Sequence, residues 1–120
     1  MRQERFIEIC KKHGLEQLTK EEAVKTVMGG QHYVCFSLPE DHDRVIAQLN
    51  RNNNQIELKN SIEIYTNGTI DIGYTGYSSM YFDSENESKF EKNLELYLRL
   101  VKFIKKDIKK FQIESICKDE

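Results

Sequence analysis

The sequence lacks a long apolar run, an excess of positive charge and a pair of cysteines at metal-ligand spacing. Arg99, Lys102 and Lys105 interrupt its most apolar stretch far short of the roughly 20 residues that a membrane-spanning helix needs. The formal net charge of −2 argues against a dedicated nucleic-acid binder, because neutralising phosphates requires a positive surface. We therefore expect neither a membrane nor a nucleic acid as a partner.

The N-terminus and the cysteines indicate the compartment. The first ten residues contain no uninterrupted apolar segment and no small-residue cleavage site, so they do not form a secretory signal. Cys10, Cys35 and Cys117 are scattered, with no CxxC or Cys/His ligand spacing. We expect a cytoplasmic protein whose cysteines are reduced packing residues, and we expect no metal and no cofactor.

One long helix is the dominant pattern in what remains. With 120 residues, of which 38% are hydrophobic and 32% charged, the chain is expected to form a single globular domain over residues 1–120. Between Ser84 and about Phe111 apolar residues recur at helical spacing, after a Ser84/Glu87 capping box. Leu96, Leu100 and Phe103 widen this apolar stripe beyond the needs of a surface helix. The helix is therefore expected to be covered on two sides, by a sheet and by either the N-terminal helices or a partner chain.

Local signals predict three shorter helices before it. The first spans residues 3–13, with Gly14 as a left-handed cap. The second opens at a Thr19/Glu22 capping box and ends at Gly29–Gly30. Pro39 is expected near the start of the third, where its missing N–H costs nothing. The predicted buried residues of the last two are Ala23, Val24, Val27 and Met28, and Val45, Ile46 and Leu49.

Alternating polarity predicts strands over residues 31–38, 55–66 and 77–83, the second of them broken near Asn60. A fourth strand, with Ile70, Ile72 and Tyr74 on its inner face, is predicted between the last two. Asn67–Gly68 marks a hairpin within this region. A two-residue loop would pair Ile64 with Asp71 and put the isoleucines of its two strands on opposite faces, whereas a three-residue loop pairs Ile64 with Ile70. We choose the second register. The predicted fold is α+β, with element order α-α-β-α-β-β-β-α and a largely antiparallel sheet of about four strands.

The chosen register brings acidic and aromatic residues together on the outer face of the sheet. Glu63 falls opposite Asp71, and Tyr65 falls opposite Thr69. Solvated carboxylates would explain each residue singly, but carboxylates combined with tyrosines suit an interface with a basic partner. The candidate partner-binding residues are Glu63, Tyr65, Asp71, Tyr77 and Tyr81.

No other pattern predicts a catalytic residue. The lysines of the last helix match its dipole and form a solvated face, with no aromatic residue on that side for bases to stack on. His13, His32 and His42 stand alone. His32 and Cys35 are three residues apart on a strand, hence on opposite faces.

A protein-binding module is the leading hypothesis. It would be a small inhibitor or immunity-type protein that occludes the active site of a basic partner, such as a bacterial nuclease-type toxin. The first alternative is a dimeric chaperone or adaptor with Leu96, Leu100 and Phe103 as its homodimer seam. The second alternative is an enzyme that uses Cys35. The expected oligomeric state is monomer or homodimer.

Overall fold

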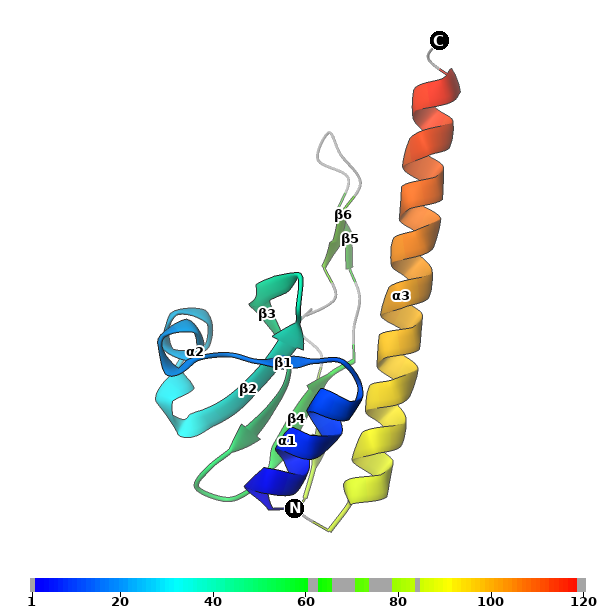
Figure 1. Cartoon of the computed structure of the whole chain (residues 1–120). Helices are drawn as coiled ribbons and strands as arrows, with labels where there is room; N and C mark the ends of the chain where they lie inside the picture. The colour runs from blue at the N-terminus through cyan, green and yellow to red at the C-terminus, as the bar shows by residue number, and fades with distance from the viewer. Residues whose placement is uncertain (1, 61–62, 66–70, 74–78, 84, 119–120) are drawn as a thin grey trace.

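The computed structural model describes residues 2–60, 63–65, 71–73, 79–83 and 85–118, with side chains for 2–60, 79–83 and 85–110. Its described residues confirm the α+β class (Figure 1). The main sheet is antiparallel and has five strands where about four were expected, in the order β1-β2-β3-β4-β7, and β5 and β6 form a separate pair. The strands are β1 (Glu16–Gln17), β2 (Tyr33–Leu38), β3 (Asp41–Asn50), β4 (Ile56–Lys59), β5 (Glu63–Tyr65), β6 (Asp71–Gly73) and β7 (Ser79–Phe82). The helices are α1 (Gln3–Lys12), α2 (Lys20–Thr26), the 3₁₀ turn η1 (Gly30–His32) and α3 (Glu87–Lys118).

The predicted caps at Gly14 and Thr19 are confirmed, whereas α2 ends at Thr26, before the expected end at Gly29–Gly30. Gly14, at φ +84°, follows α1 in the left-handed conformation, and its N–H donates to the Lys11 carbonyl. The Leu15 N–H donates to the Cys10 carbonyl, which completes a Schellman motif. In α2, the Glu22 N–H donates to Thr19 Oγ1 at 3.2 Å and the Thr19 N–H donates to Glu22 Oε1 at 3.0 Å.

The predicted third helix is wrong, because this segment is the strand β3. Pro39 and Glu40 instead form a two-residue loop, since Leu38 and Asp41 are register partners in β2 and β3. Positions 45–49 of β3 are all buried, so they fit a strand covered on both faces as well as a helix. Val45, Ile46 and Leu49 are buried as predicted.

A bulge in β3 brings two consecutive residues to the main core. Phe36 of β2 pairs with Ala47, whereas Ser37 pairs with Val45, so Ile46 has no partner in β2. Such an extra residue bends the strand. Ile46 and Ala47 both belong to the main hydrophobic cluster, while Val45 belongs to the second.

Helices cover the two faces of the sheet unequally. The inner face packs against α1 and α3 through the main cluster, in which Phe6, Phe36 and Phe90 are fully buried. The outer face packs against α2 through a small cluster of Leu18, Ala23, Cys35 and Val45. Because α2 has only seven residues, its cover ends over β2 and β3. Its buried face is narrower than predicted, since Val24 and Met28 are exposed.

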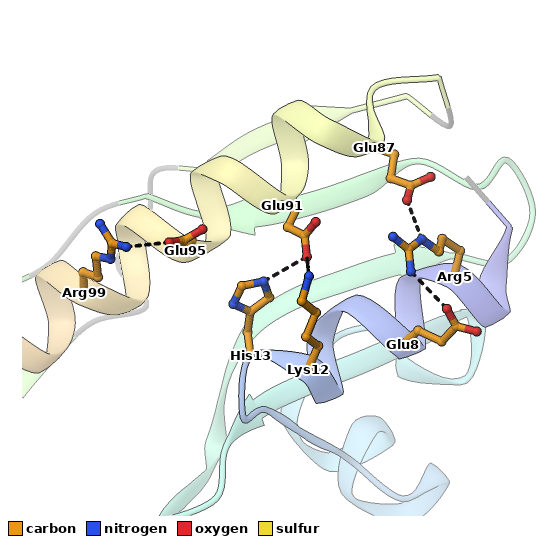
Figure 2. Close-up of polar contacts among 8 residues, drawn as sticks. All are labelled: Arg5, Glu8, Lys12, His13, Glu87, Glu91, Glu95 and Arg99. Atoms are coloured by element: carbon orange, nitrogen blue, oxygen red, sulfur yellow. Dashed lines mark hydrogen bonds and ion pairs between the residues drawn. The ribbon is translucent and has the colours of Figure 1, made fainter.

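Ion pairs fix α1 against the first turns of α3 (Figure 2). Arg5 contacts Glu87 and also pairs with Glu8. Glu91 accepts from Lys12 Nζ at 3.2 Å and lies 3.0 Å from His13 Nε2. These contacts hold α1 along one side of α3. They lower the pKa of Glu91, chiefly through the hydrogen bond with His13.

Within the described residues, the N-terminal helices do not provide the expected second cover of α3, which leaves a partner chain as the other alternative. Leu96, Leu100 and Phe103 remain 51%, 48% and 63% exposed, because α1 lies along another side of the helix and α2 packs on the outer face of the sheet. The helix also extends to Lys118, past its expected end near Phe111, since no glycine or proline interrupts residues 111–118. Ser84 of the predicted capping box lies outside the described residues.

The predicted register of the hairpin is wrong by two residues. Ile64 pairs with Ile72 instead of Ile70. Alternation alone cannot detect a shift of two, because isoleucine still pairs with isoleucine. The other pairs are Glu63 with Gly73 and Tyr65 with Asp71, so Glu63 is not opposite Asp71 and Tyr65 is not opposite Thr69.

Candidate functional site

A row of four cross-strand partners runs over the outer face of the sheet. Cys35 of β2 pairs with Gln48 of β3, Gln48 with Glu57 of β4, and Glu57 with Tyr81 of β7. We call these four residues the polar row. Residues in register share a face, so the polar row begins under α2 and ends where α2 no longer covers the sheet. Cys35 is 2% exposed, Gln48 8% and Tyr81 61%.

Hydrogen bonds connect the polar row from end to end. Cys35 Sγ lies 3.9 Å from Gln48 Oε1, and Gln48 Nε2 donates to Glu57 Oε2 at 3.2 Å. The Glu57 carboxylate also accepts from the Tyr81 hydroxyl and pairs with Lys59 at 3.5 Å. The hydrogen bond with Glu57 raises the pKa of Tyr81, because deprotonation of the tyrosine would place two negative charges side by side. The polar row thus places the hydroxyl of an exposed tyrosine beside the Glu57 carboxylate.

A hollow of about 310 Å³ lies beside the polar row. Glu57 and Gln48 form part of its wall, and Met28, 98% exposed, lies at the end of α2 on its other side. The exposed Asp43 also lines it and has no ion-pair partner among the described residues. The remaining lining residues are Thr26, Val27, Arg44, Val45 and Lys59. The hollow combines carboxylates with an apolar rim, which fits the long, partly apolar side chain of a lysine or arginine.

The structure places the predicted partner-binding residues in two groups. Tyr81 is on the outer face, as expected for a contact residue. Tyr65 and Asp71 are register partners in the β5–β6 pair. Glu63 pairs with Gly73 two positions further along the same two strands. Tyr77 lies outside the described residues.

Sequence reasoning missed the residues that surround Tyr81. The predicted third helix includes Gln48, so the sequence pattern did not indicate that this residue lies in the sheet. Its position between the apolar Ala47 and Leu49 was the available signal, because a polar residue between two apolar ones is typical of a strand. Glu57 stands in the same way between Ile56 and Leu58, and both residues were available as outer-face candidates.

Cys35 has the environment of a packing residue. Burial raises the pKa of its thiol to about 11, which keeps it protonated at neutral pH. A cavity of about 340 Å³ reaches Cys35 between α2 and β2, and no histidine is among its described lining residues. His42 is instead bound by Glu16 and Glu22, and His13 by Glu91. Within the described residues, these contacts place no histidine beside the Cys35 thiol.

The described ranges contain neither a metal-ligand cluster nor a membrane-spanning helix. No group of three or more His, Cys, Asp or Glu side chains there could hold a metal ion. No helix within those ranges is long and apolar enough to cross a membrane.

Comparison with known proteins leaves the fold and the polar row as the basis for a functional argument. No protein-family model matches the chain, and no curated protein or solved structure is significantly similar to it. The class that the structure defines is an α+β protein with a five-stranded antiparallel sheet and a long C-terminal helix.

Proposed function

We propose that this chain is a cytoplasmic protein-binding module that binds a basic partner through the uncovered half of its outer sheet face. The observation that carries the proposal is Tyr81, which is 61% exposed and hydrogen-bonded to Glu57, a residue that lines the hollow beside the polar row. An oriented tyrosine adds contact area with little further loss of side-chain entropy on binding. This is the property of a residue that anchors an interface.

The electrostatics of the site favour a basic partner. A lysine or arginine entering the hollow would meet the Asp43 carboxylate, which has no ion-pair partner among the described residues, and then Glu57. Arg44 and Lys59 also line the hollow, and Lys59 pairs with Glu57, so these two bases limit the attraction. Asp43 is therefore the main charge available for pairing with the partner, and Tyr81 provides the apolar contact.

Inhibition by occlusion is the mechanism we propose for such a module. The partner would be a basic enzyme, such as a nuclease-type toxin, whose phosphate-binding residues pair with the carboxylates of the site. Support for this type of enzyme comes from the small size and the net charge of −2.

Affinity capture from a lysate of the native source, at low and at raised salt, tests the proposal. Tyr81→Ala and Asp43→Lys change the site, while Glu4→Lys on α1 makes the same charge change on the other side of the sheet. We expect the wild type and Glu4→Lys to recover one basic protein in stoichiometric amount, and raised salt to release it. Tyr81→Ala should weaken its binding by roughly 30-fold, the effect of losing an anchor residue.

Two results would contradict the proposal. Equal recovery of the same partner by all variants would exclude the polar row as the site. Recovery of no basic partner would exclude a dedicated complex in that source. With a purified partner, one equivalent of the module should abolish its enzymatic activity, and persistent activity in the saturated complex would exclude inhibition. Glu63→Lys combined with Asp71→Lys tests separately whether the β5–β6 pair contributes.

A dimeric chaperone or adaptor is the second candidate, and the exposed stripe on α3 favours it. In this function two copies would associate through α3, and the sheet would hold a segment of a client protein.

A further inference from the structure

Three large apolar side chains form an exposed stripe on α3. Leu96, Leu100 and Phe103 follow one another at spacings of four and three residues, the spacing of a helix-packing seam. They are 51%, 48% and 63% exposed, although the opposite side of the same helix, at Leu94 and Val101, is buried. In Figure 1 the sheet and α1 lie on one side of α3 only. We call Leu96, Leu100 and Phe103 the α3 stripe.

Opposite charges stand at the two ends of the α3 stripe. Lys89 precedes Leu96 by two helical turns, and Asp107 follows Leu100 by two turns, so both lie on the line of the stripe. Both side chains are exposed, and neither has an ion-pair partner among the described residues. Among the α3 residues whose side chains the structure describes, the other acidic ones are already paired, Glu87 and Glu91 with α1 and Glu95 with Arg99 (Figure 2).

We propose that the α3 stripe binds the α3 stripe of a second copy of this chain, with the two helices antiparallel around a two-fold axis. Leu96 of each copy would then pack on Leu100 of the other, with Phe103 over Asn93. In the same register Lys89 of each copy lies beside Asp107 of the other. The two ion pairs at the ends are equivalent, as the symmetry of an isologous dimer requires.

The charges select this direction over the parallel one. A parallel pair would place Lys89 against Lys89 and Asp107 against Asp107, at both ends of an apolar contact. A stripe with opposite charges at its ends is self-complementary only when one copy is reversed. A second copy in this direction therefore covers the apolar residues of the α3 stripe and pairs Lys89 with Asp107.

Sedimentation velocity across the micromolar range is the first test. The wild-type chain of 14.2 kDa should sediment as a dimer, and Leu100→Lys should be monomeric because it would bury two unpaired charges in the seam. Val24→Lys is the matched control, since it makes the same type of change at an exposed apolar residue of α2, and it should stay dimeric. A wild type that is monomeric at every concentration overturns the proposal. So does a Leu100→Lys variant that still dimerises.

Charge exchange tests the direction without disturbing the apolar contact. Lys89→Asp alone and Asp107→Lys alone should each weaken dimerisation by about tenfold, since each converts two attractions into repulsions. The double variant Lys89→Asp/Asp107→Lys should restore the wild-type dissociation constant. If the single changes have no effect, or if the double variant is weaker than either, the antiparallel register is wrong. Binding of a basic partner by the polar row is a separate measurement, so failure of one proposal leaves the other unaffected.

Discussion

Cys35 shows how burial decides the chemistry of a single residue. It lies 3.9 Å from Gln48 Oε1 under α2, and its pKa of about 11 leaves almost no thiolate at neutral pH. Alkylation of Cys35 in a Cys117→Ser background should therefore be slow. Its rate should match the rate of unfolding, because only opened molecules expose the thiol. Mass spectrometry of labelled peptides measures this, and rapid stoichiometric labelling of folded protein would revive the hypothesis of a nucleophilic cysteine.

His42 is the residue at which pH should act on stability. Its Nδ1 lies 2.8 Å from Glu22 Oε2 and its Nε2 lies 2.8 Å from Glu16 Oε2. Carboxylates accept hydrogen bonds, so the protonated, positively charged imidazole, which can donate from both nitrogens, suits this site best. These bonds raise its pKa above the ordinary 6.5, with the bond to Glu22 as the larger cause.

The direction of the pH effect follows from this shift. A raised pKa means that His42 contributes its full stability below about pH 6.5, and that the contribution is lost as pH rises through the folded-state pKa. Glu22 has a lowered pKa, chiefly because of the Thr19 N–H, so its contribution is present above about pH 4.5 and lost in more acidic solution. His42 and Glu22 therefore both contribute fully to stability between about pH 4.5 and pH 6.5.

Urea unfolding of the wild type and His42→Gln at several pH values measures the effect. The wild-type midpoint should fall as pH rises from 6.5 through the folded-state pKa of His42. The midpoint of the variant should change less over the same range. Equal slopes in the two proteins would show that the ion pairs with Glu16 and Glu22 contribute nothing to stability.

At the scale of elements, Gly30 fixes the way in which the chain leaves α2. A Cβ atom at Gly30 would lie 2.0 Å from the Ala23 carbonyl oxygen, whereas one at Gly14 would meet nothing within 4 Å. Gly30→Ala should cost roughly 3 kcal/mol, because the clash involves backbone that cannot rotate away. Gly14→Ala should cost about 1 kcal/mol, from its left-handed conformation alone. Urea unfolding separates these values, and equal losses would mean that η1 shifts freely away from α2.

Elements bounded by capping signals could be predicted from the sequence, and β3 could not. The capping box at Thr19 and the cap at Gly14 are local, so neighbouring residues determine both. Positions 45–49 of β3 are buried on both faces, which removes the alternation that identifies a strand. Pro39, expected at the start of a helix, is part of a hairpin loop, a role that depends on β2 as a pairing partner.

The candidate site was predictable to the same limited extent. Tyr81 was identified from the alternation of β7, and its exposure agrees with that assignment. Its neighbours Glu57 and Gln48 come from strands whose order in the sheet a single sequence does not reveal. The sequence indicates that the apolar stripe of α3, which includes Leu96, Leu100 and Phe103, is too wide to be covered by the sheet alone. It does not indicate whether another helix covers these three residues. Their exposure follows from the positions of α1 and α2, which the structure provides.

At the scale of the whole molecule, a chain of aromatic rings joins the sheet to both helices of the inner face. The Phe6 ring lies 5.5 Å from Phe36 in β2 and 5.6 Å from Phe90 in α3, and the Phe90 ring lies 5.8 Å from Phe82 in β7, measured between centroids. Phe90→Ala should therefore destabilise the fold by roughly 3–5 kcal/mol. Tyr81→Ala, at an exposed position, should cost far less.

Thermal or urea unfolding followed by circular dichroism compares the two variants. The loss in Phe90→Ala should appear as one cooperative transition, because the ring contacts elements from both ends of the fold. A separate early transition of α3 would mean that the helix docks independently of the sheet. Equal losses in the two variants would show that the aromatic cluster does not determine stability.

The contact between α1 and α3 also has a consequence during translation. Arg5 and Glu87, which join these helices, are 82 residues apart. At typical rates of synthesis, roughly 4 to 16 seconds separate the appearance of the two residues. During this interval the apolar side of α1, with Phe6, Ile9 and Cys10, has no α3 to pack against. The nascent chain therefore carries an apolar surface without its partner helix at one end until the helix at the other end has been made.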